Sequence, residues 1–241
     1  ILHANSLPSV PAVWGWPIAL GLNFGQNNKN TGLNRLAVGL VAYYPFNGNA
    51  NDESGNNLDF SVSPAHGEGR LGNDQSSAFL NTNTAFSTPN VTLGATGFSG
   101  SLWLSLHKPI SNQGERALIQ GSWNNSSGLF SLGFGANGKG GIAVKDATNN
   151  EKYTETAPNY FDLNRWYHIA FTGDGSTLKL YIDGNLHSSV ATTLATKISP
   201  IVLGGDTGYY CDSALLDEVR IYNRALSAEE VSQLYTLEKP N

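Results

Sequence analysis

The chain of 241 residues is long enough to bury a large hydrophobic core, and an all-β sandwich of this size is often one domain. Only 14% of the residues are charged and the formal net charge is −5, which argues against a nucleic-acid binder, because such a protein needs a basic face to neutralise phosphates. No run of about 18 or more apolar residues is present, so the sequence predicts no segment that spans a bilayer.

Two features of the composition bear on where the protein works. Cys211 is the only cysteine, so no internal disulfide can form, and we expect a half-buried small residue there. The low charge and the many Asn, Ser, Thr and Gly residues are typical of a secreted surface. We therefore expect a secreted, extracellular or cell-surface protein.

Residues 1–38 read as an N-terminal extension that differs from the rest of the chain. Pro8, Pro11 and Pro17 interrupt an apolar run, and the alternation in residues 18–24 predicts a strand. An exposed apolar strand needs a sheet edge or a groove to cover it. We expect this segment to pack on the main domain, or to add to a neighbouring copy and form a homo-oligomer.

Residues 39–241 are predicted to form one all-β domain. Short apolar or alternating runs are separated by loops rich in Asn, Ser and Gly, which indicates a sandwich or a closed sheet. The strands predicted outside the central stretch are residues 40–46, 59–62, 78–81, 98–107, 117–120, 129–135, 141–145, 201–204 and 215–222.

The central stretch, residues 165–188, predicts an antiparallel meander of three strands. In residues 166–171 two sets of three side chains alternate, which indicates a strand with two different faces. Asp174-Gly175 and Asp183-Gly184 each lie between alternating apolar runs, and Asp-Gly in that setting is a strong signal for a tight hairpin turn.

One short helix is predicted near the C-terminus. Ser227 followed by Glu230 forms a capping box, in which each side chain binds the backbone amide of the other residue. Val231, Leu234 and Tyr235 are expected to face the sheet.

Three blocks of the sequence together resemble one family. They are GLVAYYPFNGNANDESGNN at residues 39–57, RWYHIAFTGDGSTLKLYIDG at residues 165–184 and LDEVRIYNRALSAEEVSQLY at residues 216–235. Each resembles a part of the bacterial laminin-G-like, concanavalin A-like jelly-roll domains. The resemblance implies an all-β, two-sheet antiparallel sandwich with one curved, concave sheet. Relatives are sugar-binding modules of secreted enzymes or adhesive parts of surface proteins, and some carry a structural calcium ion. Residues 1–38 have no counterpart in this family.

Two clusters of oxygen-bearing side chains are candidates for a calcium site. Hard cations bind six to eight oxygen ligands, and the sequence supplies them at Asn47, Asn49, Asn51, Asp52 and Glu53, and again at Asp217 and Glu218. First and last strands of a jelly roll commonly lie side by side, so the clusters could meet, with Asp52 and Asp217 as the main ligands. In the alternative, these side chains only cap turns through hydrogen bonds to the backbone.

A sugar site needs exposed aromatic faces for stacking and polar groups held by rigid loops. Trp103 and Trp166 lie within predicted strands and are expected in the core instead. The candidates for contact with a glycan lie in the loops, and they are Trp123, Asn124, Asn125, Tyr153, Tyr160, Asp206, Tyr209, Tyr210 and Asp212.

The sequence does not favour catalysis. Glycosidases need two carboxylates that flank the scissile bond, and the Glu-x-Asp-x-x-Glu run of related sandwich enzymes is not present around Asp217. His168 is expected to be a strand histidine with a hydrogen-bonded ring, and the histidines show no metal-ligand spacing. The sequence thus favours a non-enzymatic carbohydrate-binding or adhesive domain, with calcium rigidifying the fold. The alternative is a structural subunit of an extracellular assembly that polymerises through its N-terminal strand.

Overall fold

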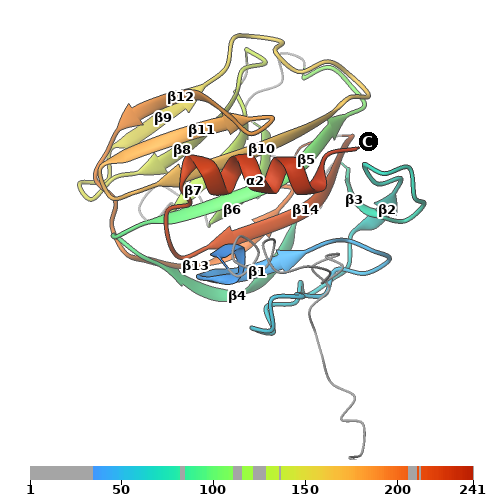
Figure 1. Cartoon of the computed structure of the whole chain (residues 1–241), viewed down its shortest axis with the longest axis horizontal. Coiled ribbons are helices and arrows are strands. Elements are labelled where there is room, and N and C mark those ends of the chain that lie inside the picture. The colour runs from blue at the N-terminus through green and yellow to red at the C-terminus, as the bar shows by residue number, and fades with distance from the viewer. Residues whose placement is uncertain are drawn as a thin grey trace, which may run out of the picture.

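The computed structural model describes residues 35–81, 85–110, 116–121, 129–135, 137–205, 211 and 213–240. Over these residues the chain forms two antiparallel sheets and a C-terminal helix, α2 (Ala228–Glu238) (Figure 1). This is the predicted jelly-roll sandwich. The larger sheet has the order β12-β11-β10-β5-β14-β3-β2, with β1 also paired to β14, and the smaller sheet has the order β4-β13-β6-β7-β8-β9.

The strands of the larger sheet are β1 (Leu40–Tyr44), β2 (Ala65–Gly67), β3 (Ser77–Leu80), β5 (Phe98–Leu106), β10 (Trp166–Gly173), β11 (Thr177–Ile182), β12 (Asn185–Ala191) and β14 (Ala214–Tyr222). Those of the smaller sheet are β4 (Phe86–Leu93), β6 (Arg116–Gly121), β7 (Phe130–Phe134), β8 (Gly140–Lys145), β9 (Glu151–Glu155) and β13 (Lys197–Leu203). The central meander β10-β11-β12 and the pairing of the first strand with the last are both as predicted.

The central strands of the larger sheet are covered on both faces, with the main core on one side and an apolar cluster that includes α2 on the other. Tyr167, Ile169 and Phe171 of β10 point into the main core between the sheets. Ala170, from the other face of β10, belongs to a second apolar cluster with Val231 and Leu234 of α2. Figure 1 shows α2 lying across this outer face. The helix begins at the predicted capping box, in which Ser227 and Glu230 exchange hydrogen bonds.

The boundaries differ from the prediction in a few places. The strand predicted at residues 59–62 is absent: Asp59 instead accepts a hydrogen bond from the backbone of Asp52, and β2 begins only at Ala65. The residues of β2, β4 and β9 were not predicted to form strands. Cys211 is fully buried rather than half-buried. Residues 18–24 lie outside the described residues, so the domain boundary at residue 38 and assembly through an N-terminal strand stay predictions.

Candidate functional site

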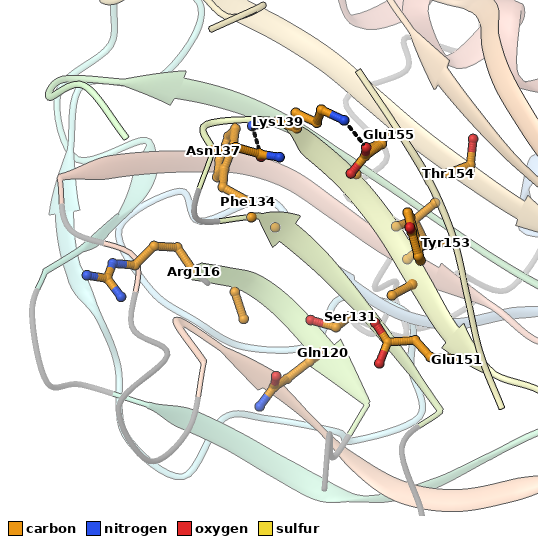
Figure 2. Close-up of a pocket in the computed structure, with 16 residues that line it drawn as sticks. Arg116, Gln120, Ser131, Phe134, Asn137, Lys139, Glu151, Tyr153, Thr154 and Glu155 are labelled. Carbon is orange, nitrogen blue, oxygen red and sulfur yellow. Dashed lines mark hydrogen bonds and ion pairs between the residues drawn. The ribbon is translucent and has the colours of Figure 1, made fainter. Parts of the chain in front are cut away.

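A groove of about 530 Å³ lies on the outer face of the smaller sheet, opposite the core. Its lining comes from β6, β7, β8 and β9 and from the turn between β7 and β8 (Figure 2). The core-facing side chains of β7 and β8 are large and apolar, whereas the residues that face the groove are small. The lining includes Arg116, Gln120, Ser131, Gly133, Asn137, Lys139, Gly141, Ala143, Glu151, Tyr153 and Glu155.

A β-bulge in β6 turns Gln120 toward this groove. The register between β6 and β7 shifts between Ala117 and Ile119, and both Leu118 and Ile119 point into the core. Bulges re-aim side chains in this way. With strict alternation Gln120 would have shared the core face with Leu118; the extra residue places it on the groove side instead. Its side chain is 2% exposed, and its Nε2 has no hydrogen-bond partner among the described residues.

Five groove-side residues are aligned in direct register across the smaller sheet. Neighbouring pairs in the strand ladders connect them without a break from β13 to β9. In order, this cross-strand row is Val202, Gln120, Ser131, Ala143 and Tyr153. Tyr153 ends the row; the residue is 58% exposed and lies beside the small side chain of Ala143. Figure 2 shows Gln120, Ser131 and Tyr153 around the groove.

Two glycines keep the floor of the groove low beside this row. A Cβ atom on Gly133 would lie 2.0 Å from the backbone oxygen of Arg116, and one on Gly141 would lie 2.6 Å from that of Thr154. Side chains are therefore excluded at both positions by close backbone approach. The result is a trough with Tyr153 at one side and polar groups around it.

The charged groups of the groove balance one another. Arg116 and Lys139 contribute two positive charges, and Glu151 and Glu155 contribute two negative ones. Lys139 forms an ion pair with Glu155 (Figure 2). Arg116 also has an interaction partner. The groove therefore presents a polar surface without a surplus of either charge.

The residues predicted to contact sugar do not all lie at the groove. Tyr153 is on strand β9, not in a loop, and lines the groove. Tyr160 is not part of the groove lining; its ring lies 5.0 Å from that of His187 and 5.2 Å from that of Phe161. The remaining candidates fall outside the described residues, and they are Trp123, Asn124, Asn125, Asp206, Tyr209, Tyr210 and Asp212. Trp103 is 2% exposed, as a core residue should be, and Trp166 is half-buried.

The two carboxylates predicted to share a calcium ion have different partners. Asp52 accepts hydrogen bonds from the backbone amides of Tyr43, Ser54 and Leu58, which is the turn-capping arrangement of the alternative reading. Asn49 caps the same loop by accepting a hydrogen bond from the amide of Asn51. Within the described ranges, no group of three or more His, Cys, Asp or Glu side chains could hold a metal ion.

Asp217 belongs instead to a buried ionic cluster under the C-terminal end of α2, formed by Arg70, Asp217, Glu218, Arg220 and Glu238. Arg70 Nη1 lies 2.9 Å from Asp217 Oδ2 and 3.2 Å from Glu218 Oε1. Arg220 pairs with Glu238 and with Glu218, the latter at 2.7 Å. The cluster ties the last turn of α2 to β14 and to the segment between β2 and β3.

A second bulge, in β14, assembles this ionic cluster. The register of β14 against β5 shifts between Asp217 and Arg220, and Glu218 at the shift has a φ of 54°. Leu216 and Val219 point into the core on either side of it. Since the bulge adds one residue, Asp217 and Arg220 come to lie on the same face of the sheet, beneath α2. A positive φ is unusual for glutamate, and it is maintained here by the surrounding ion pairs.

The buried ionic cluster perturbs its carboxyl groups. Burial raises the pKa of Asp217 to about 6 although Arg70 opposes the shift. Burial likewise raises the pKa of Glu238 to about 7, again against an arginine, Arg220. Burial also acts upward on Glu218, but Arg220 and Arg70 together bring its pKa below its usual value. With three carboxyls and two guanidinium groups, the cluster retains a proton near neutral pH.

His168 departs from its prediction. It is fully buried next to Trp103 and Tyr235, at ring distances of 5.4 Å and 6.0 Å. Neither ring nitrogen has a hydrogen-bond partner within the described part of the chain, so the expected hydrogen-bonded ring is wrong. Burial, with Arg220 and Arg70 nearby, lowers the pKa of His168 to about 3. His168 is therefore neutral in the folded protein at neutral pH.

Comparison with known proteins gives a family match and many structural matches. Residues 80–232 match the laminin G family described as the concanavalin A-like lectin/glucanases superfamily. No curated protein sequence matches the chain. The binding domain of Paraclostridial Mosquitocidal Protein 1 is 23% identical, with a TM-score of 0.67 over 83% of this chain and 52% of that one.

Two botulinum neurotoxin structures have the same fold. The receptor binding domain of botulinum neurotoxin D is 19% identical, with a TM-score of 0.67 over 83% of this chain and 53% of that one. The serotype D ligand binding domain in complex with N-acetylneuraminic acid is 19% identical, with a TM-score of 0.68 over 86% and 53%. The chain spans about half the length of these structures. Among the residues described, no helix has the length and apolar character needed to cross a membrane.

Proposed function

Because the chain belongs to the laminin G family of the concanavalin A-like lectin/glucanases superfamily, we propose that it is a non-enzymatic carbohydrate-binding domain whose glycan lies in the groove of the smaller sheet. The observation that carries this proposal is Tyr153, an exposed aromatic ring beside a low floor of Gly133, Gly141 and Ala143. Aromatic faces bind the apolar faces of sugar rings, and polar groups around them bind hydroxyls.

The carboxylates of the groove support binding rather than hydrolysis. A glycosidase needs two carboxyl groups that both flank the scissile bond. The groove lining contains two glutamates, Glu151 and Glu155, and Glu155 is committed to its ion pair with Lys139. The two are therefore not a pair of free carboxylates poised on one glycosidic bond.

The proposed setting is outside the cell, where the domain would bind or adhere to glycans. The Asn- and Gly-rich sequence with few charged residues supports this, and so does the shared fold of toxin binding domains, one of which is complexed with N-acetylneuraminic acid. Calcium binding in the loop of Asn47, Asn49 and Asp52 stays a prediction. The hydrogen bonds that the carboxylate of Asp52 already accepts would have to be shared with the ion.

A glycan array tests the proposal, run once with calcium and once with a chelator. We expect binding that Tyr153→Ala weakens roughly fivefold to tenfold, because the substitution removes an aromatic contact of about 1 to 1.4 kcal/mol. Tyr160→Ala is the matched control, since Tyr160 is also exposed but lies outside the groove lining. A loss of binding in Tyr160→Ala with none in Tyr153→Ala would refute the groove as the site. Binding that disappears with the chelator would establish the calcium prediction.

A further inference from the structure

The groove has two properties that narrow its ligand beyond carbohydrate in general. The cross-strand row places Tyr153 and Gln120 on strands three positions apart in the sheet, with Ala143 and Ser131 between them. At about 4.8 Å per strand, this separation is roughly 14 Å, which is more than one sugar ring covers. A ligand that uses both ends of the row must therefore contain several sugar units.

The charges of the groove argue against an anionic ligand. Recognition of a carboxylate needs a cation that is not already neutralised. Lys139 is paired with Glu155, and the groove lining contains as many carboxylates as cations. Glu151 lies beside Ser131 in Figure 2 and faces Lys145 across the strands, so this part of the groove also has no surplus of positive charge for an anion. An uncharged sugar meets none of these obstacles.

Gln120 offers a specific polar contact at the far end of the row. A buried donor without a partner destabilises a protein by roughly 1–3 kcal/mol. Among the residues that the structure describes, Nε2 of Gln120 is such a donor. Gln120 is 2% exposed, lines the groove and reaches that face only through the bulge in β6. A ligand oxygen that accepts this hydrogen bond would remove the penalty. A buried polar group that reduces stability in this way is typical of a binding site.

We propose that the groove binds an uncharged oligosaccharide that lies across the strands, with one sugar stacked on Tyr153 and another accepting a hydrogen bond from Gln120 Nε2. This proposal rests on the proposed carbohydrate-binding function and assigns its ligand class. Gln120 is then the residue that determines which sugar occupies the far end of the row.

The first test compares ligands on the full chain. Isothermal titration uses neutral linear N-acetyllactosamine and β-glucan oligosaccharides of one to six residues, together with the N-acetyllactosamine chains capped by N-acetylneuraminic acid. We expect affinity to rise with length up to three or four residues and to gain nothing from the acidic cap. Saturation at a monosaccharide, or a preference for the capped chains, would overturn the inference.

The second test uses variants that separate binding from stability. Gln120→Leu should weaken binding at least tenfold while raising the melting temperature, because it removes an unpartnered donor with little change in volume. If Gln120 only stabilised the fold, Gln120→Leu would lower the melting temperature instead. Ala143→Trp should block the centre of the row, and Thr92→Trp, on the exposed side of β4 in the same sheet, is its control.

These outcomes distinguish the inference from the function on which it rests. No binding to any glycan would refute both. Glycan binding that survives Ala143→Trp and Gln120→Leu would leave the carbohydrate-binding function standing and overturn the groove-spanning ligand. Binding lost in both variants and retained in Thr92→Trp would support it.

Discussion

Replacement of Arg220 by Met is expected to lower the free energy of unfolding by about 3–5 kcal/mol, the usual effect of breaking a buried ion pair. Arg220 is 3% exposed and is the partner of both Glu218 and Glu238. Without it, Arg70 is the remaining cation of the cluster, and it forms an ion pair with Glu218 but donates only to the backbone carbonyl of Glu238. The last turn of α2 would lose its ionic contact with β14.

The decrease in the free energy of unfolding caused by Arg220→Met should depend on pH. Without the guanidinium, both glutamates are stabilised less well as anions, so the pKa of Glu218 and the pKa of Glu238 should each rise above their values in the intact protein. A carboxyl with a raised folded-state pKa loses stability as pH rises through that value. The deficit relative to wild type should therefore be larger at pH 8 than at pH 5.

Urea denaturation at both pH values measures this effect, with the midpoint and slope fitted separately. Arg165→Met is the matched control: Arg165 pairs with Asp183 at 3.2 Å, but 55% of its side chain is exposed, and such surface pairs contribute about 0–1 kcal/mol. Addition of Glu238→Gln to Arg220→Met should recover part of the loss. Equal deficits in Arg220→Met and Arg165→Met would contradict burial of the ionic cluster.

The sequence predicted secondary structure best in strands whose alternate side chains enter the core. The meander was predictable because alternate residues of β10 and β11 enter the core between the sheets, and Asp-Gly turns join the three strands. The capping box of α2 was equally readable, since Ser227 and Glu230 are only three residues apart. Both signals are local, so they do not depend on the rest of the fold.

The unpredicted strand β9 shows why other elements were missed. Its sequence EKYTE has one buried residue, Thr154, and it is an edge strand of the smaller sheet. Its position therefore comes from its hydrogen bonds with β8, and hydrophobic periodicity does not mark it. Tyr153 was consequently expected in a loop, although it was correctly named as a candidate.

The two bulges account for most of what the sequence could not predict about the candidate sites. Gln120 faces the groove only because the ladder shifts near Leu118, and Asp217 meets Arg70 across 147 residues of chain. Asp217 was proposed as a calcium ligand together with Asp52 because the first and last strands of a jelly roll commonly lie side by side. Strand adjacency was right, but the bulge at Glu218 directs Asp217 to the face that α2 covers, where Arg70 is its partner.

His168 is expected to have a second large effect on the free energy of unfolding, and this effect appears only below neutral pH. Its pKa is about 3 in the folded protein against 6.5 as a free side chain. Below pH 6.5 the unfolded chain therefore binds a proton that the folded chain does not, and stability from this group is lost as pH falls toward 3. Each pH unit inside this window corresponds to about 1.4 kcal/mol.

Asp217 and Glu238 act in the opposite direction over part of the same range. Their raised pKa values mean that the folded chain holds protons that the unfolded chain has released, so their contribution is present at low pH and is lost as pH rises toward 6 and 7. The pH dependence of wild-type stability in acid is therefore the sum of two opposing contributions, one from Asp217 and Glu238 and one from His168. A substitution at His168 removes the second contribution and leaves the first.

His168→Leu is the informative variant, because leucine fills a similar volume and cannot bind a proton. Relative to wild type, its free energy of unfolding should increase by about 1.4 kcal/mol per pH unit as pH falls from 6 to 4. Near pH 8 the difference should be small, since the lost ring contacts with Trp103 and Tyr235 are offset by removal of two unpartnered nitrogens. Urea titrations at half-unit intervals measure it, with His107→Leu as the exposed control. Parallel curves for His168→Leu and wild type would mean that the folded protein protonates His168 as readily as the unfolded chain does, and that its ring is not sealed between α2 and the sheet.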